Sequence, residues 1–319
     1  MPRPAANPRV GYALVVAGAL FFIANAGVSR VTMRAGVDPA LLTTVRVTFS
    51  AAIFGAYALF ARRSALRIPR GRNLATLVVL GVAGVAGVQW TYNVAIDRVP
   101  VGIALLLEYL APVLVVLWVR FVRGEQVRDR MWVAIAASLV GLAVISQIWQ
   151  GLAFDGIGVL AGLGAALCFA TYFLMGEHNV GTDDPVRVIF WAFVMATIAM
   201  NVVQPIWGLS DLGRSSSLLG TLDTWSAPVW VLLAWVVVLG TVTPFFLELL
   251  ALQHLPATIV TVVATLEPVG ATVLGWAWFN ESLNAIQLAG GLLVLVGIGL
   301  AQSARIEHPA HDAVPEHPL

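Results

Sequence analysis

Long apolar stretches, separated by short polar breaks, run along almost the whole chain. The breaks are arginine clusters, Asp-Pro pairs and Gly/Pro turns, and each stretch between them has about 20 residues, enough for a helix to cross the hydrocarbon core of a bilayer. This pattern predicts an all-α membrane protein with ten transmembrane helices. Their expected ranges are 10–29, 40–60, 74–95, 100–119, 131–149, 156–176, 186–207, 228–250, 257–279 and 283–302.

The two ends of the chain lack this apolar pattern. We interpret residues 1–9 as a cytoplasmic N-terminal tail and residues 303–319, which contain three prolines and three histidines, as a disordered cytoplasmic tail. A cleaved signal peptide is an alternative for the first stretch, which follows Arg3 and Arg9 and contains Ala24-Asn25-Ala26. The nine further stretches favour a retained helix. Metal binding by the tail histidines is a second alternative, and we expect no metal site.

The chain aligns with itself when it is shifted by 156 positions. The aligned pairs include Gly84 and Gly240, Pro100 and Pro256, Pro112 and Pro268, and Glu125 and Glu281, and a shift near 147 pairs Gly11 with Gly158 and Phe22 with Phe169. Paired prolines and a paired loop glutamate are harder to obtain by chance than paired Gly or Leu. We predict two five-helix repeats, residues 10–150 and 151–302. An odd number of spans makes the second repeat enter the membrane inverted relative to the first.

Composition and charge narrow the function classes. The chain is 59% hydrophobic and only 11% charged, and its 18 basic and 17 acidic residues nearly cancel, so a nucleic-acid partner is not indicated. No lysine is present, which excludes a Walker-A loop and a Schiff base to retinal or pyridoxal phosphate. We expect no cofactor. The single cysteine, Cys168, lies in an apolar run and is expected to be a buried hydrophobic residue.

Arginines are distributed unevenly between the predicted loops. Thirteen fall on the side of the N-terminus, and four fall on the other side, namely Arg30, Arg34, Arg98 and Arg214. Because positively charged loops stay in the cytoplasm, we expect both termini there, with the protein in the cytoplasmic (inner or plasma) membrane.

Three motifs give the chain a family resemblance. They are Thr44-Val45-Arg46-Val47, the run from Pro100 through Glu108-Tyr109-Leu110-Ala111-Pro112 to Arg123-Gly124-Glu125, and Leu266-Glu267-Pro268 through Asn280-Glu281. With them the chain resembles the ten-span EamA-like branch of the drug/metabolite transporter superfamily. The glutamate upstream of Pro112 is similar to that of the threonine/homoserine exporter group. The resemblance implies export, with spans 1, 3, 4, 6, 8 and 9 around a central cavity and spans 5 and 10 at the periphery.

Four ionisable side chains fall inside predicted spans: Arg46, Glu108, Glu248 and Glu267. Each costs at least about 2.5 kcal/mol in hydrocarbon, so each is a functional candidate. Glu108 and Glu267 lie eight and eleven residues beyond their matched prolines, near mid-crossing, and the repeat register places them on one helix face. Desolvation there favours the protonated carboxyl, which suits proton coupling. The alternative is a permanently protonated packing residue.

The other two ionisable residues have weaker functional indications. Arg46 needs carboxylate or carbonyl partners, and we favour a structural ion pair over binding of a substrate carboxylate. Glu248 lies about four residues from a predicted loop, so we favour contact with interfacial water.

Prolines, aromatic rings and amides complete the candidate set. Pro112 and Pro268 each remove a backbone donor in mid-helix and act either as gate hinges or as static bends. The substrate-lining candidates are Trp90, Asn93, Tyr109, Tyr172 and Phe245, together with Asn25, Gln89, Tyr92 and Phe246. Lipid-facing or interfacial positions are the alternative for the aromatic residues. Gly84, Gly87, Gly158, Gly162, Gly290 and Gly291 are expected to allow close helix packing.

Together these features predict a secondary transporter that exports a small polar or amphipathic metabolite of the amino-acid class by alternating access, with proton antiport as the expected coupling. The first alternative is an uncoupled facilitator whose glutamates bind a substrate amine. An intramembrane enzyme or a scaffold subunit is the alternative from another class. It is disfavoured because no nucleophile elbow and no zinc-type histidine cluster is present. The expected partners are a small molecule, the lipid bilayer and, if transport is coupled, protons, and the sequence does not indicate the oligomeric state.

Overall fold

The structure, a computed structural model, describes residues 7–122, 124, 129–146, 155–180, 183–251, 254, 263 and 266–305. In the first half the α-helices are α1 (Pro8–Arg34), α2 (Pro39–Ala61), α3 (Arg72–Val79), α4 (Val88–Arg98), α5 (Val101–Glu108), α6 (Ala111–Phe121) and α7 (Asp129–Ser146). In the second half they are α8 (Gly156–Val180), α9 (Pro185–Val203), α10 (Val229–Val237), α11 (Thr243–Ala251), α13 (Leu266–Phe279) and α14 (Ala285–Arg305). Most of the predicted C-terminal tail, its three histidines and the motif residues Arg123 and Glu125 lie outside the described residues.

Six helical segments among the described residues are long and apolar enough to cross a membrane. They are Pro8–Arg34, Pro39–Ala61, Arg72–Arg98, Gly156–Gly176, Val186–Val203 and Val229–Glu248. Shorter apolar helices cover Val101–Val115, Trp132–Ile145 and Ala285–Leu300. Large side chains such as Phe60 and Val202 are exposed on the surface, as expected of residues that face lipid. The chain is therefore a multi-pass membrane protein, and the number of ten crossings stays a prediction.

Two Asp-Pro pairs start helices at corresponding places in the two halves. The Asp38 carboxylate accepts a hydrogen bond from the Ala40 amide at the start of α2, and the Asp184 carboxylate accepts one from Val186 at the start of α9. In both cases a proline follows, where its missing N–H costs nothing because first-turn amides have no partner inside the helix. The Asp-Pro breaks read from the sequence are thus helix starts.

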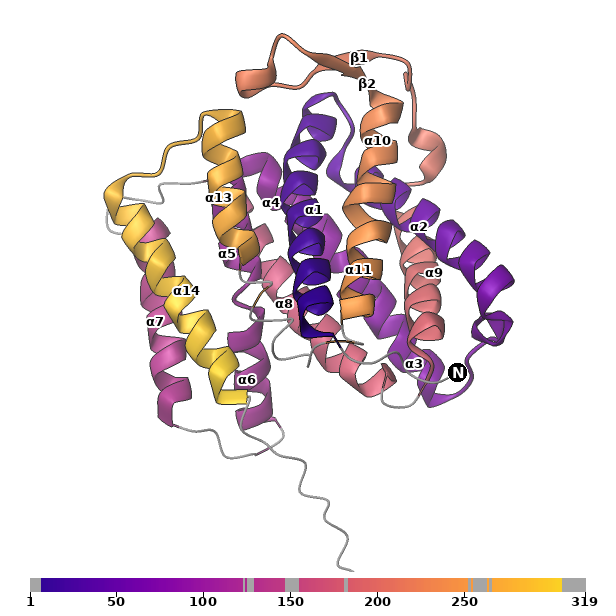
Figure 1. Ribbon diagram of the computed structural model, residues 1–319, viewed down its shortest axis with the longest axis horizontal. Helices are drawn as coiled ribbons and strands as arrows, with labels where there is room; N and C mark the ends of the chain where they lie inside the picture. Colours follow the sequence, from indigo (N-terminus) through magenta and orange to yellow (C-terminus); the bar gives the residue numbers. More distant parts are fainter. Residues whose placement is uncertain are drawn as a thin grey trace, which may run out of the picture.

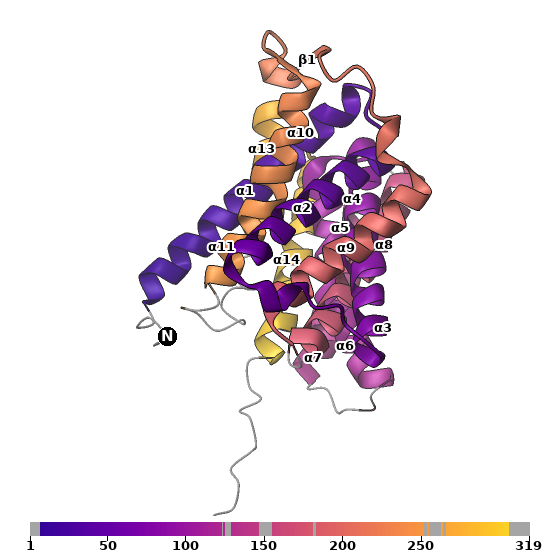
Figure 2. The same cartoon turned by 90° about the vertical axis from the view of Figure 1, so that its right-hand side faces the viewer.

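The only β-strands among the described residues form a short antiparallel hairpin. Strand β1 (Ser215–Ser217) pairs with β2 (Ser226–Pro228), and Ser216 lies opposite Ala227. Figures 1 and 2 show this hairpin at one end of the molecule, with the N-terminal end of α1 and the C-terminal end of α14 at the other. The prediction of an all-α fold is corrected to this extent.

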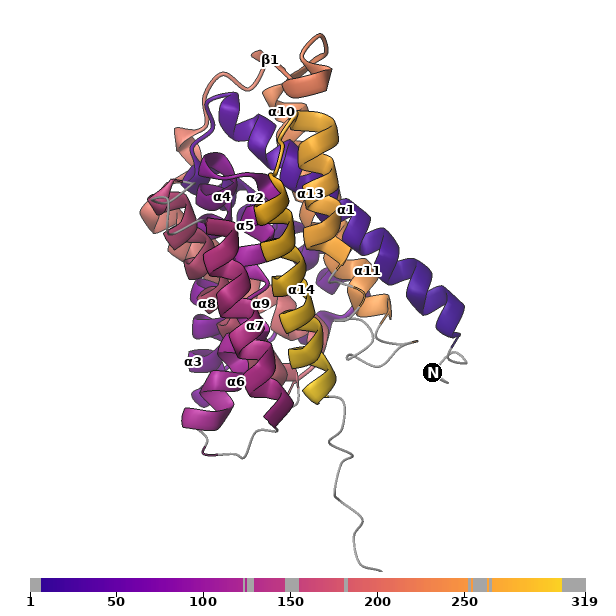
Figure 3. The same cartoon turned by 90° about the vertical axis from the view of Figure 1, so that its left-hand side faces the viewer.

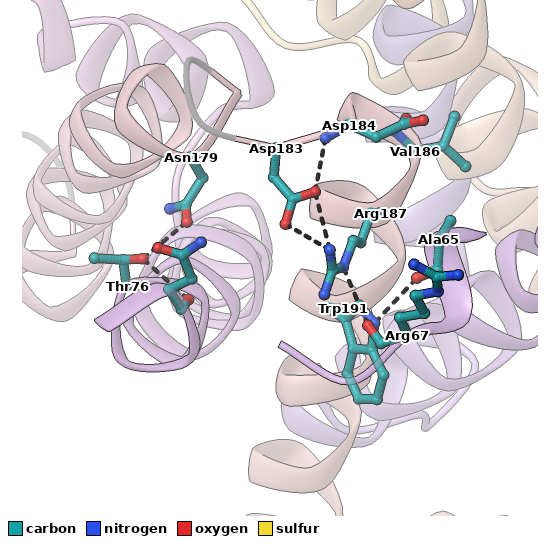
Figure 4. Close-up of polar contacts among 10 residues, drawn as sticks. Ala65, Arg67, Thr76, Asn179, Asp183, Asp184, Val186, Arg187 and Trp191 are labelled. Atoms are coloured by element: carbon teal, nitrogen blue, oxygen red, sulfur yellow. Dashed lines mark hydrogen bonds and ion pairs between the residues drawn. The ribbon is translucent and has the colours of Figure 1, made fainter. Parts of the chain in front are cut away.

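At the end opposite the hairpin, polar contacts tie the first half of the chain to the second (Figure 4). Arg187 on α9 donates through Nε to the Arg67 carbonyl at 3.1 Å, and the Trp191 indole donates to the Ala65 carbonyl at 3.2 Å. The Thr76 hydroxyl donates to the Asn179 side chain at 2.8 Å, which joins α3 to α8. The bonds of Arg187 and Trp191 fix the loop after α2, which includes η1 (Arg63–Leu66), against α9.

The helices pack in pairs drawn from the two halves. Helix α2 packs on α9, α5 on α13, and α7 on α14. Helix α1 packs on α11 and α13, while α8 packs on α4 and α5. Figure 3 shows α7 and α14 side by side along one flank, so the pair that corresponds to predicted spans 5 and 10 lies at the periphery.

Glycines allow the close approaches that the sequence predicted. A Cβ on Gly162 would lie 2.6 Å from the Leu107 side chain, and one on Gly290 would lie 2.8 Å from the Ile145 backbone nitrogen. A Cβ on Gly84 would likewise lie 3.0 Å from the Tyr172 Cα. Helix contacts this tight are typical of small residues in membrane bundles.

Two π-helical segments interrupt long helices at equivalent places. Segment η2 (Leu80–Gly87) joins α3 to α4, and segment η6 (Val238–Val242) joins α10 to α11. Adding the repeat shift of 156 to residues 82–86 gives 238–242, so the two π-segments coincide in the register found in the sequence. A π-segment widens the helix and leaves carbonyls without the usual partner, and such segments occur often at functional sites.

Candidate functional site: an interior cluster of polar residues

The fourth predicted span is broken next to its glutamate. Helix α5 ends at Glu108, Tyr109 and Leu110 form a turn, and α6 starts at Ala111. Pro112 therefore stands in the first turn of α6, where proline is tolerated, and not in mid-helix as we expected. The turn is buried in protein, which is the condition for irregular backbone at membrane depth. Pro268 lies in α13 close to residues outside the described set, so its mid-helix position is not tested.

Two carboxyl groups on other helices lie in electrostatic range of Glu267. Glu267 on α13 is 6% exposed, and the two groups are Glu108 on α5 and Glu248 on α11. The Tyr109 hydroxyl is within hydrogen-bonding reach of the Glu267 carboxyl group and in electrostatic range of both other acids. The structure thus places Glu108, Glu267 and Tyr109 in one region of the interior.

Glu248 is one of the four ionisable candidates, and contact with interfacial water was the favoured interpretation for it. Its side chain is half-buried and packs beside α1, where a Cβ on Gly18 would lie at an ordinary contact distance of 3.6 Å from the Glu248 Cγ. The repeat gave no signal for Glu248.

Arg46 is 4% exposed and holds one of the two π-segments. Its Nη2 donates to the Gly240 carbonyl at 2.9 Å, and its Nε donates to the Thr241 hydroxyl at 2.5 Å. Thr241 in turn donates to the Val236 carbonyl at 2.9 Å. Within the described part of the chain, Nη1 of Arg46 has no hydrogen-bond partner, and Glu108 lies in electrostatic range of the guanidinium.

Buried amides add unpartnered acceptors on α4. Asn93 donates to the Thr43 hydroxyl at 3.0 Å, but its own carbonyl oxygen has no partner among the described residues. The same holds for the carbonyl oxygen of Gln89, one turn earlier on α4. Asn25 lies against Gly240 and accepts from Ser29 at 3.4 Å. Buried acceptors without a donor are costly, and a ligand N–H or water satisfies such groups.

The aromatic candidates form two overlapping sets. Tyr109 and Tyr172 both pack on Phe169 at about 6 Å between ring centroids, and Tyr172 lies in electrostatic range of Glu248. Trp90 and Phe245 pack against an apolar core around Phe193, on which Tyr172 also packs, and Phe245 makes an edge contact with Phe193 at 5.9 Å. Phe246 is exposed.

The chain is similar to known membrane transporters along its length. The family model for the EamA-like transporter family matches residues 9–147 and 156–302. The threonine/homoserine exporter RhtA of Escherichia coli K12 is 29% identical over 245 residues, which cover 76% of each chain. An uncharacterized transporter of Archaeoglobus fulgidus is 27% identical over 263 residues, covering 81% of this chain and 86% of the relative.

A protein of known crystal structure, 20% identical in sequence, superposes on this chain with a TM-score of 0.58. The superposition covers 93% of this chain and 99% of the other, which shows a shared fold. The family match spans both halves and leaves out only the ends and the residues between the halves. With that coverage, and with buried polar groups at the centre of a helical bundle, the chain belongs to the EamA-like transporter family and is a transporter, not an enzyme.

Proposed function

We propose that the chain exports a small amino acid or a closely related amphoteric metabolite across the cytoplasmic membrane, with protons moving inward in exchange. Transport occurs by alternating access of two inverted five-helix halves, residues 10–150 and 151–302. Both termini lie in the cytoplasm, as the arginine distribution indicates. The relative named as a threonine/homoserine exporter supports this substrate class.

The packing pattern supports the inverted repeat. If the halves are related by a twofold axis in the membrane plane, a contact between α1 and α11 requires one between α8 and α4, and a contact between α1 and α13 requires one between α8 and α6; all four are present. The pairs α2 with α9 and α7 with α14 each join an element to its own counterpart. The coincident π-segments and the matched Asp-Pro helix starts follow the same symmetry.

One observation carries the substrate assignment: a buried guanidinium and buried carboxyl groups share one interior cluster. Arg46 keeps Nη1 unused, which suits a carboxylate, while Glu108, Glu267 and the free amide oxygens of α4 suit an ammonium group. An α-amino acid carries both groups on one carbon. Glu108 lies eight residues beyond Pro100, which is about 12 Å along a helix. This distance places Glu108 near the middle of a hydrocarbon core about 30 Å thick.

Proton exchange follows from the same carboxyl groups. On the outer side, protonation of Glu108 or Glu267 removes the counter-charge of the ammonium group and releases the substrate. On the cytoplasmic side, loss of the proton restores that charge, and the next substrate binds. Glu267 is 6% exposed, and a buried carboxylate needs a cationic partner, which the ammonium group of a bound substrate provides.

The test is transport of radiolabelled threonine and homoserine in vesicles of known orientation with an imposed pH gradient. We expect Glu108→Gln and Glu267→Gln to lose gradient-driven transport by about tenfold or more, equivalent to about 1.4 kcal/mol in the transport cycle. The matched control is Asp223→Asn, which removes an exposed carboxylate in the hairpin loop and leaves transport unchanged. Wild-type rates and unchanged gradient dependence in both glutamine variants contradict proton exchange at these residues.

An uncoupled facilitator is the second candidate, because the same cluster binds an amine without proton exchange. In that case the glutamine variants lose substrate affinity, and wild-type transport does not respond to the pH gradient. The response of wild-type transport to the pH gradient therefore distinguishes proton-coupled export from uncoupled facilitation.

A further inference from the structure

An ion pair closes the bundle at the end that carries the hairpin. Arg30, near the end of α1, reaches across to Glu281 in the loop after α13, and its Nη1 contacts the Glu281 Oε1. The two side chains are 11% and 17% exposed, so solvent screens this pair less than a surface pair. Neither residue belongs to the interior cluster.

Both partners also bind backbone groups of the neighbouring spans. Arg30 Nε donates to the Ile96 carbonyl at 2.7 Å, and Nη2 donates to the Val99 carbonyl, so the guanidinium neutralises free carbonyls at the end of α4. Glu281 Oε2 accepts from the Val101 amide at 3.1 Å, at the start of α5. Two side chains thus join α1, α4, α5 and α13 at one point.

Close contacts beside the ion pair also hold α1, α13 and the segment before α10 together. A Cβ on Gly27 of α1 would lie 2.6 Å from the Trp278 ring of α13, and the Arg30 guanidinium lies 5.3 Å from the centre of the Phe279 ring. The loop before α10 crosses over this end: Thr221 donates to the Ala277 carbonyl at 3.0 Å, and the Trp278 indole donates to the Leu218 carbonyl at 2.9 Å.

A surface cavity of about 480 Å³ lies directly at the pair. Arg30, Phe279 and Glu281 line it together with Arg34, Asp97 and Gly220. Tyr92 lies four residues before Ile96 on the same face of α4 and interacts electrostatically with both Arg30 and Glu108. Tyr92 is buried and lies in electrostatic range of both Arg30 and the interior acids.

We propose that Arg30 and Glu281 form the outer gate of the transporter: while the pair is intact, the path from the outer surface to the interior cluster is shut, and release of substrate requires the pair to part. This inference rests on the proposed alternating access and orientation. It adds two residues to the transport machinery.

The test measures how fast a membrane-impermeant maleimide added outside intact cells labels a cysteine at position 92. The reporter is Tyr92→Cys in a Cys168→Ser background, which removes the single native cysteine. Arg30→Gln or Glu281→Gln is then added. Arg34→Gln is the matched control, because Arg34 lies one turn further on α1 and pairs with Asp97 at 3.5 Å while 55% exposed.

We expect labelling about tenfold faster or more in either gate variant, no further increase in the double variant, and the unmodified rate in Arg34→Gln. Equal rates in Arg30→Gln and Arg34→Gln would overturn the gate. If the glutamine variants do not fold, Arg30→Cys with Glu281→Cys in the Cys168→Ser background is joined by a reducible bifunctional reagent. Export that stops on cross-linking and returns on reduction supports the gate, and export that continues when cross-linked refutes it. Labelling requires no substrate, so it separates this inference from the substrate assignment.

Discussion

At the scale of single residues, Arg46 shows what a sequence can and cannot say about a buried charge. The sequence predicted that Arg46 needs partners, since a guanidinium does not deprotonate. It did not predict that the partners are the Gly240 carbonyl and the Thr241 hydroxyl, because these depend on a π-segment in another helix. These partners are a hydroxyl and a carbonyl in place of the carboxylate of the expected ion pair, and binding of a substrate carboxylate stays a prediction.

Replacing Thr241 by valine tests this arrangement. Valine keeps the shape but removes the acceptor for Arg46 Nε, which leaves a buried charged donor unpaired, so we expect a loss of about 1–3 kcal/mol in stability. Thermal unfolding of the detergent-purified protein, followed by tryptophan fluorescence, measures the loss. Thr171→Val is the control, because its hydroxyl bonds only the Leu167 carbonyl of its own helix. Equal melting temperatures for the two variants would show that the Arg46 bond contributes nothing.

At the scale of elements, the apolar pattern predicted most helices closely. The expected span 40–60 is α2 (Pro39–Ala61), and 156–176 falls inside α8 (Gly156–Val180). The pattern missed the two π-segments, the turn at Tyr109 and the β1–β2 hairpin. Apolar composition reports burial in lipid or protein, whereas a π-segment or a turn changes only backbone hydrogen bonding, which hydropathy does not record.

The α7–α14 pair gives a prediction at this scale. Gly290→Ala places a methyl group 2.8 Å from the Ile145 nitrogen and 2.9 Å from the Gly141 carbonyl, both of them backbone atoms that cannot rotate away. We expect a loss of about 1–3 kcal/mol by over-packing. Gly299→Ala on the same helix meets nothing within 4 Å and should leave stability unchanged or slightly raised. Measured melting temperatures that do not differ between the two variants would exclude the tight contact between α7 and α14.

At the scale of the whole molecule, the repeat explains why part of the interior cluster was predictable. The register that pairs Pro112 with Pro268 placed Glu108 and Glu267 on one face of a continuous helix; the turn at Tyr109 and Leu110 breaks that helix, and the two acids lie in electrostatic range of each other. Glu248 has no such internal signal, and the register pairs Glu281 with Glu125 but does not indicate Arg30 as its partner. Their contacts arise only when helices distant in sequence pack, as at Gly18 and at the end of α4.

The inversion of the two halves is tested most directly by finding which compartment reaches two equivalent loops. Ser64 lies in η1, in the connection after α2, and Ser215 lies in β1, in the connection after α9, and both are exposed. With Cys168→Ser as background, an impermeant maleimide outside intact cells should label Ser215→Cys and should label Ser64→Cys only after the membrane is opened. Labelling of both cysteines from the same side would mean that the halves point alike, and the inverted repeat would be wrong.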